Sequence, residues 1–286
     1  MFWSKILRFF SEDIAMDLGT ANTLLYTRDG GIIVNEPSVV AIDTRNNEVL
    51  AVGSEAKRAR GRTPKRIKTI RPMKSGVIAD FDTTSRMIVY FVNKAIGRSH
   101  LVKPSLVISV PTGITGVEKK AVIDAAATAG AGRVSLIEEP MAAAIGADLP
   151  VTEPVGTLIA DIGGGTSEVA VITMSAITVS QSIRIAGDAM NEILLRMLRD
   201  KYRLDVGENT AEHLKILLGS TQPVPDLPDY AEISGRDLVS GVPMTKKVTS
   251  EDVRLALKEP VEEIASAVMR VLEKTPPELA ADIYTS

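Results

Sequence analysis

The 286-residue chain contains no cysteine and only two histidines, His100 and His213. The absence of cysteine excludes disulfide scaffolds, thiolate metal sites and cysteine nucleophiles, and two distant histidines give no basis for a histidine-rich metal site. No apolar run reaches the roughly eighteen residues that a membrane-spanning helix needs. A net charge of −3 carries no signature of nucleic-acid binding, so we expect no nucleic-acid partner.

Hydrophobic residues make up 45% of the chain and charged residues 24%, the composition of an ordinary globular protein. The length corresponds to about two domains, each large enough for its own hydrophobic core. Strand-like segments alternate with helix-like ones; Leu106–Val110, for example, is followed by an alanine-rich helix over 115–129. This alternation predicts an α/β fold.

Local residue patterns predict where several elements begin and end. Residues 14–26 predict a strand, a glycine turn and a second strand, and a β-meander is expected over residues 32–52. Pro260 is expected to divide the last helical region into a short helix from about Glu251 and a longer one that ends at Lys274.

Aromatic residues make up only 4% of the chain, yet four of them lie in its first ten positions. On a helix, the bulky apolar residues of this segment share one face, and Lys5 and Arg8 lie on the other. This pattern predicts an amphipathic helix over residues 1–12 that lies in a membrane interface. The alternative is a helix docked on the protein's own core. The residues of the apolar face are Phe2, Trp3, Ile6, Leu7, Phe9 and Phe10.

Residues 57–74 contain nine cationic side chains and no acidic one. One interpretation is a solvated loop and helix face. The other is a contact with an acidic surface, either a neighbouring subunit or anionic lipid. Nucleic acid is disfavoured because no aromatic residues are interleaved for base stacking.

One sequence pattern occurs twice, 144 residues apart. Asp17-Leu-Gly-Thr-Ala-Asn22 and Asp161-Ile-Gly-Gly-Gly-Thr166 each follow an apolar strand and precede another. Small residues let backbone N–H groups approach a phosphate closely, and an aspartate at a strand end can hold the hydration shell of Mg²⁺. Either motif alone would be an ordinary turn, but the pair predicts a clamp that binds a polyphosphate from both sides.

Between these motifs, the short strand ending at Ile137 delivers Glu138 and Glu139 to the start of a small-residue helix. A carboxylate beside a phosphate site can orient or activate an attacking water. The alternative is that both glutamates only favour the helix N-terminus electrostatically.

The order DLGTAN, EEPMAAA, DIGGGT resembles the actin superfamily of nucleotide-binding proteins, which also includes heat-shock chaperones and sugar kinases. Longer segments, among them NEPSVVA, RTPKRIKTIRPMKSGVIADF and LIEEPMAAAIGA, resemble the MreB family of bacterial actin homologues. The resemblance extends from about residue 13 to residue 283. It implies an actin-like (ribonuclease H-like) α/β fold of duplicated domains, with mixed five-stranded sheets flanked by helices.

The resemblance also implies roles for particular residues in binding ATP and Mg²⁺. Asp17 and Asp161 would orient Mg²⁺ through water, and Glu139 would polarise the attacking water with help from the Thr166 hydroxyl. A helix in the second half of the chain would contact the nucleoside. The exposed-looking pair Leu101-Val102 would add a membrane contact; the alternative is that this pair begins the buried strand that follows. The implied phosphate loops are Gly19, Thr20, Ala21, Asn22 and Gly163, Gly164, Gly165, Thr166; the implied nucleoside contacts are Glu212, His213, Leu214 and Lys215.

The same resemblance implies two actin-like domains, 13–150 and 151–286, with outer subdomains at about 33–75 and 183–248. Because chains of the MreB family normally continue beyond the equivalent of Ile283, we expect the second domain to be truncated at its C-terminus.

The implied function is that of a membrane-associated cytoskeletal filament that determines rod cell shape, on the inner face of the cell membrane. The implied partners are further copies of the chain, the membrane surface and membrane proteins of the cell-wall elongation machinery. ATP hydrolysis would be coupled to filament assembly. The alternatives are a non-polymerising remnant and a small-molecule kinase of the same fold.

Overall fold

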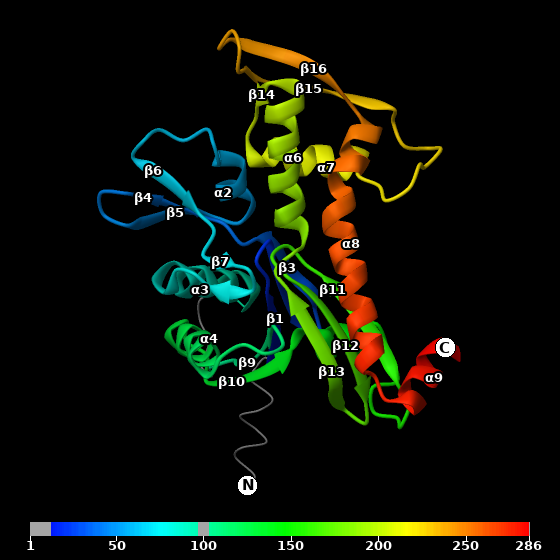
Figure 1. Cartoon of the computed structure of the whole chain (residues 1–286). Helices are drawn as coiled ribbons and strands as arrows, with labels where there is room; N and C mark the ends of the chain where they lie inside the picture. The colour runs from blue at the N-terminus through cyan, green and yellow to red at the C-terminus, as the bar shows by residue number, and fades with distance from the viewer. Residues whose placement is uncertain (1–12, 97–102, 286) are drawn as a thin grey trace. The chain divides into compact units, whose positions relative to one another are not determined.

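A computed structural model describes residues 13–96 and 103–285 of the chain (Figure 1). The chain folds into two compact units, each with its own core. The first unit comprises Met1–Ser182 and Val271–Ser286, and the second comprises Ile183–Arg270. The predicted membrane residues 1–12 and Leu101-Val102 lie outside the described residues.

The first unit is built around a five-stranded mixed sheet in the order β10-β9-β1-β2-β3. Strands β1, β9 and β10 are parallel, whereas β2 and β3 continue from β1 in antiparallel fashion. The predicted strand–turn–strand over residues 14–26 is therefore confirmed. The bounds are β1 Asp13–Leu18, β2 Asn22–Thr27, β3 Gly31–Pro37, β9 Ser105–Val110 and β10 Arg133–Glu138.

Two helices, α3 (Phe81–Ile96) and α4 (Gly116–Thr128), pack side by side against this sheet (Figure 1). Phe91 of α3 is fully buried among strand residues of the same core. Thr115 and Glu118 form a capping box that satisfies backbone N–H groups at the start of α4.

A smaller three-stranded sheet in the order β5-β4-β6 branches from the first unit between β3 and α3. The predicted meander over residues 32–52 is therefore wrong in one respect, because β3 pairs with β2 and not with β4. Pro37 ends β3, and the chain turns into the new sheet after it. The bounds are β4 Val40–Asp43, β5 Glu48–Val52, α2 Ser54–Ala59, β6 Ile67–Ile70 and the short hairpin β7 Met73–Lys74 with β8 Val77–Ile78.

A second sheet in the first unit has the order β11-β12-β13, with β11 (Thr157–Ile162), β12 (Ser167–Thr173) and β13 (Ala176–Ile183). Among the described residues this sheet has three strands, and not the five expected for each half. Helix α5 (Glu139–Gly146) contacts both sheets, and α9 (Pro277–Thr285) contacts β11.

The second unit holds α6, α7, most of α8 and a small antiparallel sheet in the order β14-β15-β16. Its core is formed by leucines of α6 and α7 that pack with Ile233 and Val248 of the sheet. The bounds are α6 Gly187–Tyr202, β14 Leu204–Asp205, α7 Glu208–Leu218, β15 Tyr230–Asp237, β16 Pro243–Thr249 and α8 Ser250–Lys274.

The predicted helix break at Pro260 is wrong, because α8 runs without interruption past this residue. Pro260 is itself buried, and it lies on the same apolar face as Leu257 and Ile264. Continuous burial on both sides of the proline offsets the loss of its backbone hydrogen bond. None of the described helices is long and apolar enough to cross a membrane.

Candidate functional site

The two glycine hairpins contact each other within the first unit. A Cβ added at Gly164, between β11 and β12, would lie 2.5 Å from the Cβ of Ala21, between β1 and β2. A Cβ added at Gly165 would lie 2.6 Å from Oγ1 of Thr20. Glycine is therefore required at both positions for the two turns to meet.

The first hairpin turn is held from outside by hydrogen bonds. The backbone N–H of Gly76, in the β7–β8 turn, donates to Thr20 Oγ1 at 2.8 Å, and Arg71 Nη2 donates to the Thr20 carbonyl at 3.2 Å. The Ser38 hydroxyl donates to the carbonyl of Gly19 at 2.6 Å. Two segments distant from the turn in sequence, one at Ser38 and one from Arg71 to Gly76, thus fix its backbone.

Asp17 and Asp161 occupy equivalent places near the ends of β1 and β11. Burial raises the pKa of Asp17, although a hydrogen bond from the Ser109 hydroxyl at 2.8 Å offsets part of this shift. Asp17 is nevertheless exposed to solvent, so this shift in its pKa is limited. Burial and the charge of Asp17 raise the pKa of Asp161. The two aspartates therefore share one electrostatic environment.

Glu139 lies at the first residue of α5, directly after β10. Burial raises the pKa of Glu139 to about 8, and the charges of Glu168, Asp17 and Asp161 contribute to the shift. A carboxylate that is half-buried among three others is costly to ionise. Such a group needs a nearby positive charge to be a carboxylate at neutral pH, and this is the setting in which catalytic acids and bases are found.

Glu168 belongs to the same cluster but was not predicted from the sequence. It is only 1% exposed, and both carboxylate oxygens accept the backbone N–H of Thr112 at 3.1 Å. Glu168 pairs with Asp161 across β11 and β12, so both side chains point to the same face of the sheet. Burial, together with the charge of Asp161, raises the pKa of Glu168 against the hydrogen bonds that lower it. A single charged residue in an otherwise apolar strand was the signal that could have revealed it.

The four carboxylates do not form a direct metal cage. No group of three acidic or histidine side chains within the described residues has the geometry to hold a metal ion. This fits Mg²⁺ that keeps most of its water molecules and is shared with phosphates, since Mg²⁺ takes few carboxylates directly. The carboxylate oxygens of Asp17 and Asp161 are of the donor type that would suit a hydrated Mg²⁺.

The remaining predicted site residues lie on α7 in the second unit. Leu214 is fully buried in the core of that unit, where it holds α7 in place. His213 is exposed, and Glu212 and Lys215 are half-buried. Lys215 Nζ donates to the carbonyl of Gly187 at 2.9 Å, which ties α7 to the start of α6.

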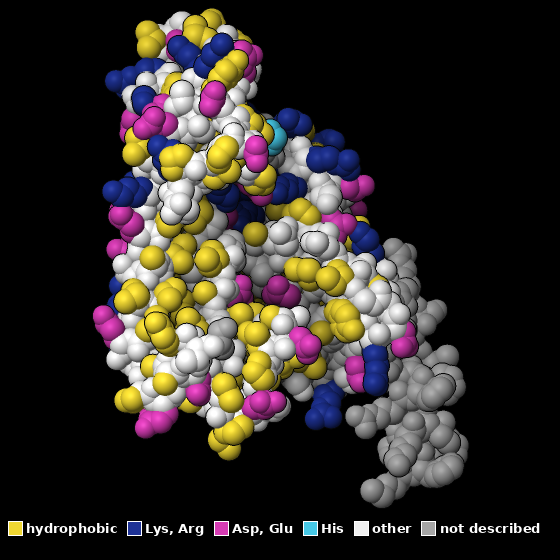
Figure 2. Space-filling model, turned by 90° about the vertical axis from the view of Figure 1, so that its right-hand side faces the viewer, with side chains coloured by type: hydrophobic (Ala, Val, Ile, Leu, Met, Phe, Trp, Pro, Cys, Tyr) yellow, Lys and Arg dark blue, Asp and Glu magenta, His cyan; other side chains and the backbone are white. Residues whose placement is uncertain are grey.

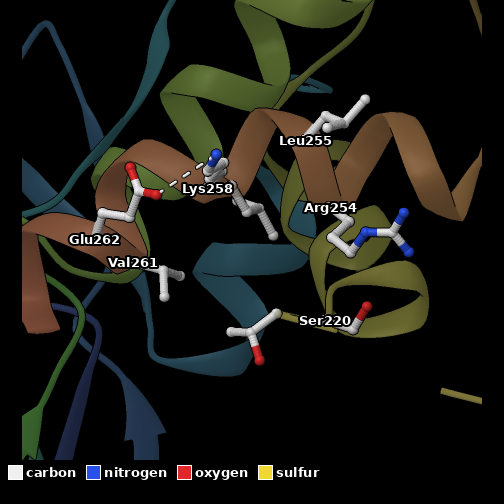
Figure 3. A pocket seen from close by; sticks show the side chains of 8 residues that line it. Ser220, Arg254, Leu255, Lys258, Val261 and Glu262 are labelled. Atoms are coloured by element: carbon white, nitrogen blue, oxygen red, sulfur yellow. Dashed lines mark ion pairs between the residues drawn. The ribbon is translucent and has the colours of Figure 1, made fainter. Parts of the chain in front are cut away.

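An open pocket lies on the surface of the second unit, between α8 and the chain after α7 (Figure 3). Lys258 and Glu262 form an ion pair at 3.6 Å at its rim, and both side chains are largely exposed. Leu257 and Val261 supply apolar lining beside Ser220. The paired charges leave no strong field inside the pocket, and we assign it no role.

The arrangement of the hairpins suits one kind of chemistry. Glycine turns expose backbone N–H groups that can hydrogen-bond phosphate oxygens. The carboxylates of β1, β11 and α5 surround the same place and can hold a hydrated cation and orient water. These elements fit a nucleoside polyphosphate with its cation.

Comparison with solved structures shows that the fold is actin-like. The chain superposes on MreB5 of Spiroplasma citri bound to ADP with a TM-score of 0.90 and 35% identity, over 95% of this chain and 82% of that one. The same protein bound to AMPPNP gives a TM-score of 0.89. A MamK double helical filament gives a TM-score of 0.78 at 21% identity, which supports the fold alone.

Comparison of sequences identifies the family. The family model described as MreB/Mbl protein matches residues 11–286. The chain is 48% identical to the cell shape-determining protein Mbl of Bacillus cereus, over 96% of this chain and 82% of that protein. It is 47% identical to the cell shape-determining protein MreB of Escherichia coli, over 98% of this chain and 82% of that protein. The chain therefore belongs to the MreB/Mbl family, which confirms the resemblance found in the sequence.

Proposed function

We propose that this chain is an ATP-binding, actin-like cytoskeletal protein whose filaments lie on the inner face of the cell membrane and direct rod cell shape. The observation that carries the proposal is the contact between two glycine hairpins beside four carboxylates, in a chain of the MreB/Mbl family. The family assignment argues against a small-molecule kinase.

Nucleotide binding has the strongest support. The structural relative at 35% identity is described as bound to ADP and to AMPPNP. In this chain, backbone N–H groups of Gly19–Asn22 and Gly163–Thr166 would hold the phosphates, and α7 would contact the nucleoside. Asp17 and Asp161 would hold Mg²⁺ through water molecules.

Glu139 is the proposed base that orients the attacking water, and the Thr166 hydroxyl would help to place that water. A base must be ionised, whereas burial and three neighbouring carboxylates raise the pKa of Glu139 to about 8. Bound Mg²⁺ would supply positive charge that lowers this pKa. The carboxylate cluster would then be ready for hydrolysis only when the cation and the phosphates are in place.

Self-association is supported by membership of the MreB/Mbl family and by the relatives' description as cell shape-determining proteins. Figure 2 shows that hydrophobic side chains gather over the lower part of the face in view, the part that holds β12, β13 and α9 in Figure 1. Met174 and Tyr284, from these parts of the chain, are 67% and 92% exposed. Exposed apolar side chains of this kind are available to bury in an interface with another copy.

Membrane association rests on the amphipathic pattern of residues 1–12 and on the apolar pair Leu101-Val102. A short amphipathic segment binds lipid weakly, and a filament that presents many copies would multiply its effect. Membrane proteins of the cell-wall elongation machinery are the proposed further partners. We also propose the four-part division into two domains with outer subdomains at about 33–75 and 183–248.

Equilibrium binding of ATP with Mg²⁺, measured on the unmodified chain and on Asp161→Ala, tests the proposal. We expect binding by the unmodified chain and its loss in the variant, because the variant removes a carboxylate that holds the cation. Sedimentation of the same preparations with nucleotide and liposomes then tests assembly. A folded chain that binds no nucleotide, or that remains monomeric under all these conditions, would contradict the proposal.

A further inference from the structure

The positive charge of the first unit is concentrated in one segment. Residues 38–75, which form the β5-β4-β6 sheet, α2 and the chain that leads into β7, contain ten Lys and Arg residues and three acidic ones. This segment therefore has a net charge of +7 in a chain whose overall net charge is −3, so the rest of the chain has a net charge of −10. Such a separation of charge marks an electrostatic contact surface.

Four cations of α2, β6 and the chain between them are exposed and form no ion pair within the described residues. Arg58, Arg62, Lys65 and Lys68 are all exposed, and none forms an ion pair within 4.0 Å with any part of the chain that the structure describes. Elsewhere in the first unit such pairs do form, as between Lys94 and Glu36 at 2.5 Å. The α2–β6 basic surface is defined here as Arg58, Arg62, Lys65, Arg66 and Lys68.

The composition of this surface does not suit a stable protein–protein contact. All of residues 53–75 are described, and none of them is an exposed large hydrophobic residue. The centre of a protein interface is usually apolar or aromatic and depleted in charge. Exposed Lys and Arg side chains without an apolar centre are instead complementary to a partner surface that carries many phosphate groups.

We infer that the α2–β6 basic surface binds the head groups of anionic phospholipids, which rests on the proposed membrane association. Two observations favour lipid over nucleic acid. The segment contains no aromatic residue on which bases could stack. The same chain begins with a predicted amphipathic segment, and basic clusters near a membrane surface are attracted to anionic lipid head groups.

Vesicle flotation tests the inference. The probes are vesicles of phosphatidylcholine alone and vesicles with about one third phosphatidylglycerol. The test variant carries Arg58→Gln, Arg62→Gln, Lys65→Gln and Lys68→Gln in the full chain. We expect its affinity for the anionic vesicles to fall at least about tenfold, with no change for the neutral vesicles. Raising the salt concentration should likewise weaken the binding of the unmodified chain to the anionic vesicles.

A matched control removes four exposed cations from another part of the same unit, by Lys103→Gln, Lys119→Gln, Lys120→Gln and Arg133→Gln. Both variants change the net charge equally, so only the position of the charge differs. A further variant with Lys65→Arg and Lys68→Arg keeps the charge and should bind as the unmodified chain does. Thermal unfolding of every variant checks that the fold is retained.

The inference would be overturned if the test variant bound anionic vesicles as well as the unmodified chain does, or if the test and control variants lost equal affinity. It would also be overturned if, in a parallel assay with a duplex oligonucleotide, the test variant lost binding to the oligonucleotide but not to the vesicles. The proposed function is tested separately by Phe2→Ser with Trp3→Ser, which should weaken binding to both kinds of vesicle. If only that variant loses binding, the membrane proposal holds and the basic surface has no part in it.

Discussion

The two glycine hairpins of the first unit are equivalent in position but different in construction. The β1–β2 turn is fixed from outside, by Gly76 and Arg71 on Thr20 and by Ser38 on Gly19. The β11–β12 turn has three consecutive glycines, and its aspartate faces a second buried carboxylate across the strands. The backbone of the β1–β2 turn is therefore held in place by its neighbours. The β11–β12 turn instead lets other backbone atoms approach closely and carries more negative charge.

This difference explains why the proposed phosphate site would need both hairpins. Asp17 has a neutral hydroxyl neighbour in Ser109, which stabilises its charged form. Asp161 has Glu168 as its cross-strand neighbour, which is destabilising when both are ionised. A cation between the two hairpins would reduce the repulsion between Asp161 and Glu168, whereas the pair of Asp17 and Ser109 has no such repulsion to reduce.

The largest effect is expected where the hairpins meet. Gly165→Ala would place a Cβ 2.6 Å from Thr20 Oγ1 and 2.9 Å from the Cα of Ser75. Because a backbone atom cannot give way easily, we expect a loss of about 2 to 3 kcal/mol in the free energy of unfolding, measured by urea denaturation. Gly163→Ala is the matched control, since its nearest neighbour, the Thr166 carbonyl oxygen, is 3.3 Å away. Equal effects of both substitutions would show that the turns do not pack as described.

A second prediction concerns the pH dependence of stability. The pKa of Glu139 is about 8 in the folded chain and near its ordinary value of 4.5 in the unfolded chain. Between these values the folded state binds more protons, so the free energy of unfolding should fall as pH rises from about 5 to about 8. We expect a fall of about 2 kcal/mol, less than the full linkage value because water reaches the half-buried carboxylate.

Glu139→Gln should remove most of this slope and raise stability at pH 8, as measured by urea unfolding at several pH values without added cations. Glu278→Gln, which removes an exposed carboxylate on α9, serves as the control and should leave the slope as it is. An unchanged slope in Glu139→Gln would mean that the other carboxylates of the cluster carry the repulsion. Added Mg²⁺ with nucleotide should reduce the slope in the unmodified chain.

The sequence was sufficient to predict the hairpins because their signals are local. An apolar strand, an aspartate and small residues lie within a few positions of one another in both halves. The same local reasoning misplaced the break at Pro260, where burial on either side keeps α8 continuous. It also missed β13, although its residues alternate between exposed and half-buried positions. At Pro260 packing against distant residues decides the structure, whereas β13 has a local alternation of residues that is typical of a strand.

The supporting residues of the site could not be predicted from local patterns. Ser109 reaches Asp17 because β9 lies parallel to β1 in a particular register, and Thr112 reaches Glu168 across 56 positions of sequence. Gly76 contacts Thr20 through a hairpin that is only two residues long on each side. Such pairings follow from strand order and register, which one sequence does not reveal.

The smallest effects are expected from substitutions beside the two aspartates, at Ser109 next to Asp17 and at Glu168 opposite Asp161. Ser109→Ala removes the hydroxyl that donates to Asp17, and we expect a loss of about 1 kcal/mol in the free energy of unfolding at pH 8. Glu168→Gln weakens the hydrogen bonds from Thr112 but also removes a like charge opposite Asp161, so the two effects should nearly cancel. Urea unfolding of both variants measures the difference. If Glu168→Gln costs more than Ser109→Ala, Glu168 acts chiefly as a hydrogen-bond acceptor that joins β12 to the turn after β9. If it costs less, charge repulsion between Asp161 and Glu168 outweighs these hydrogen bonds, as the proposed role of this hairpin in holding a cation would require.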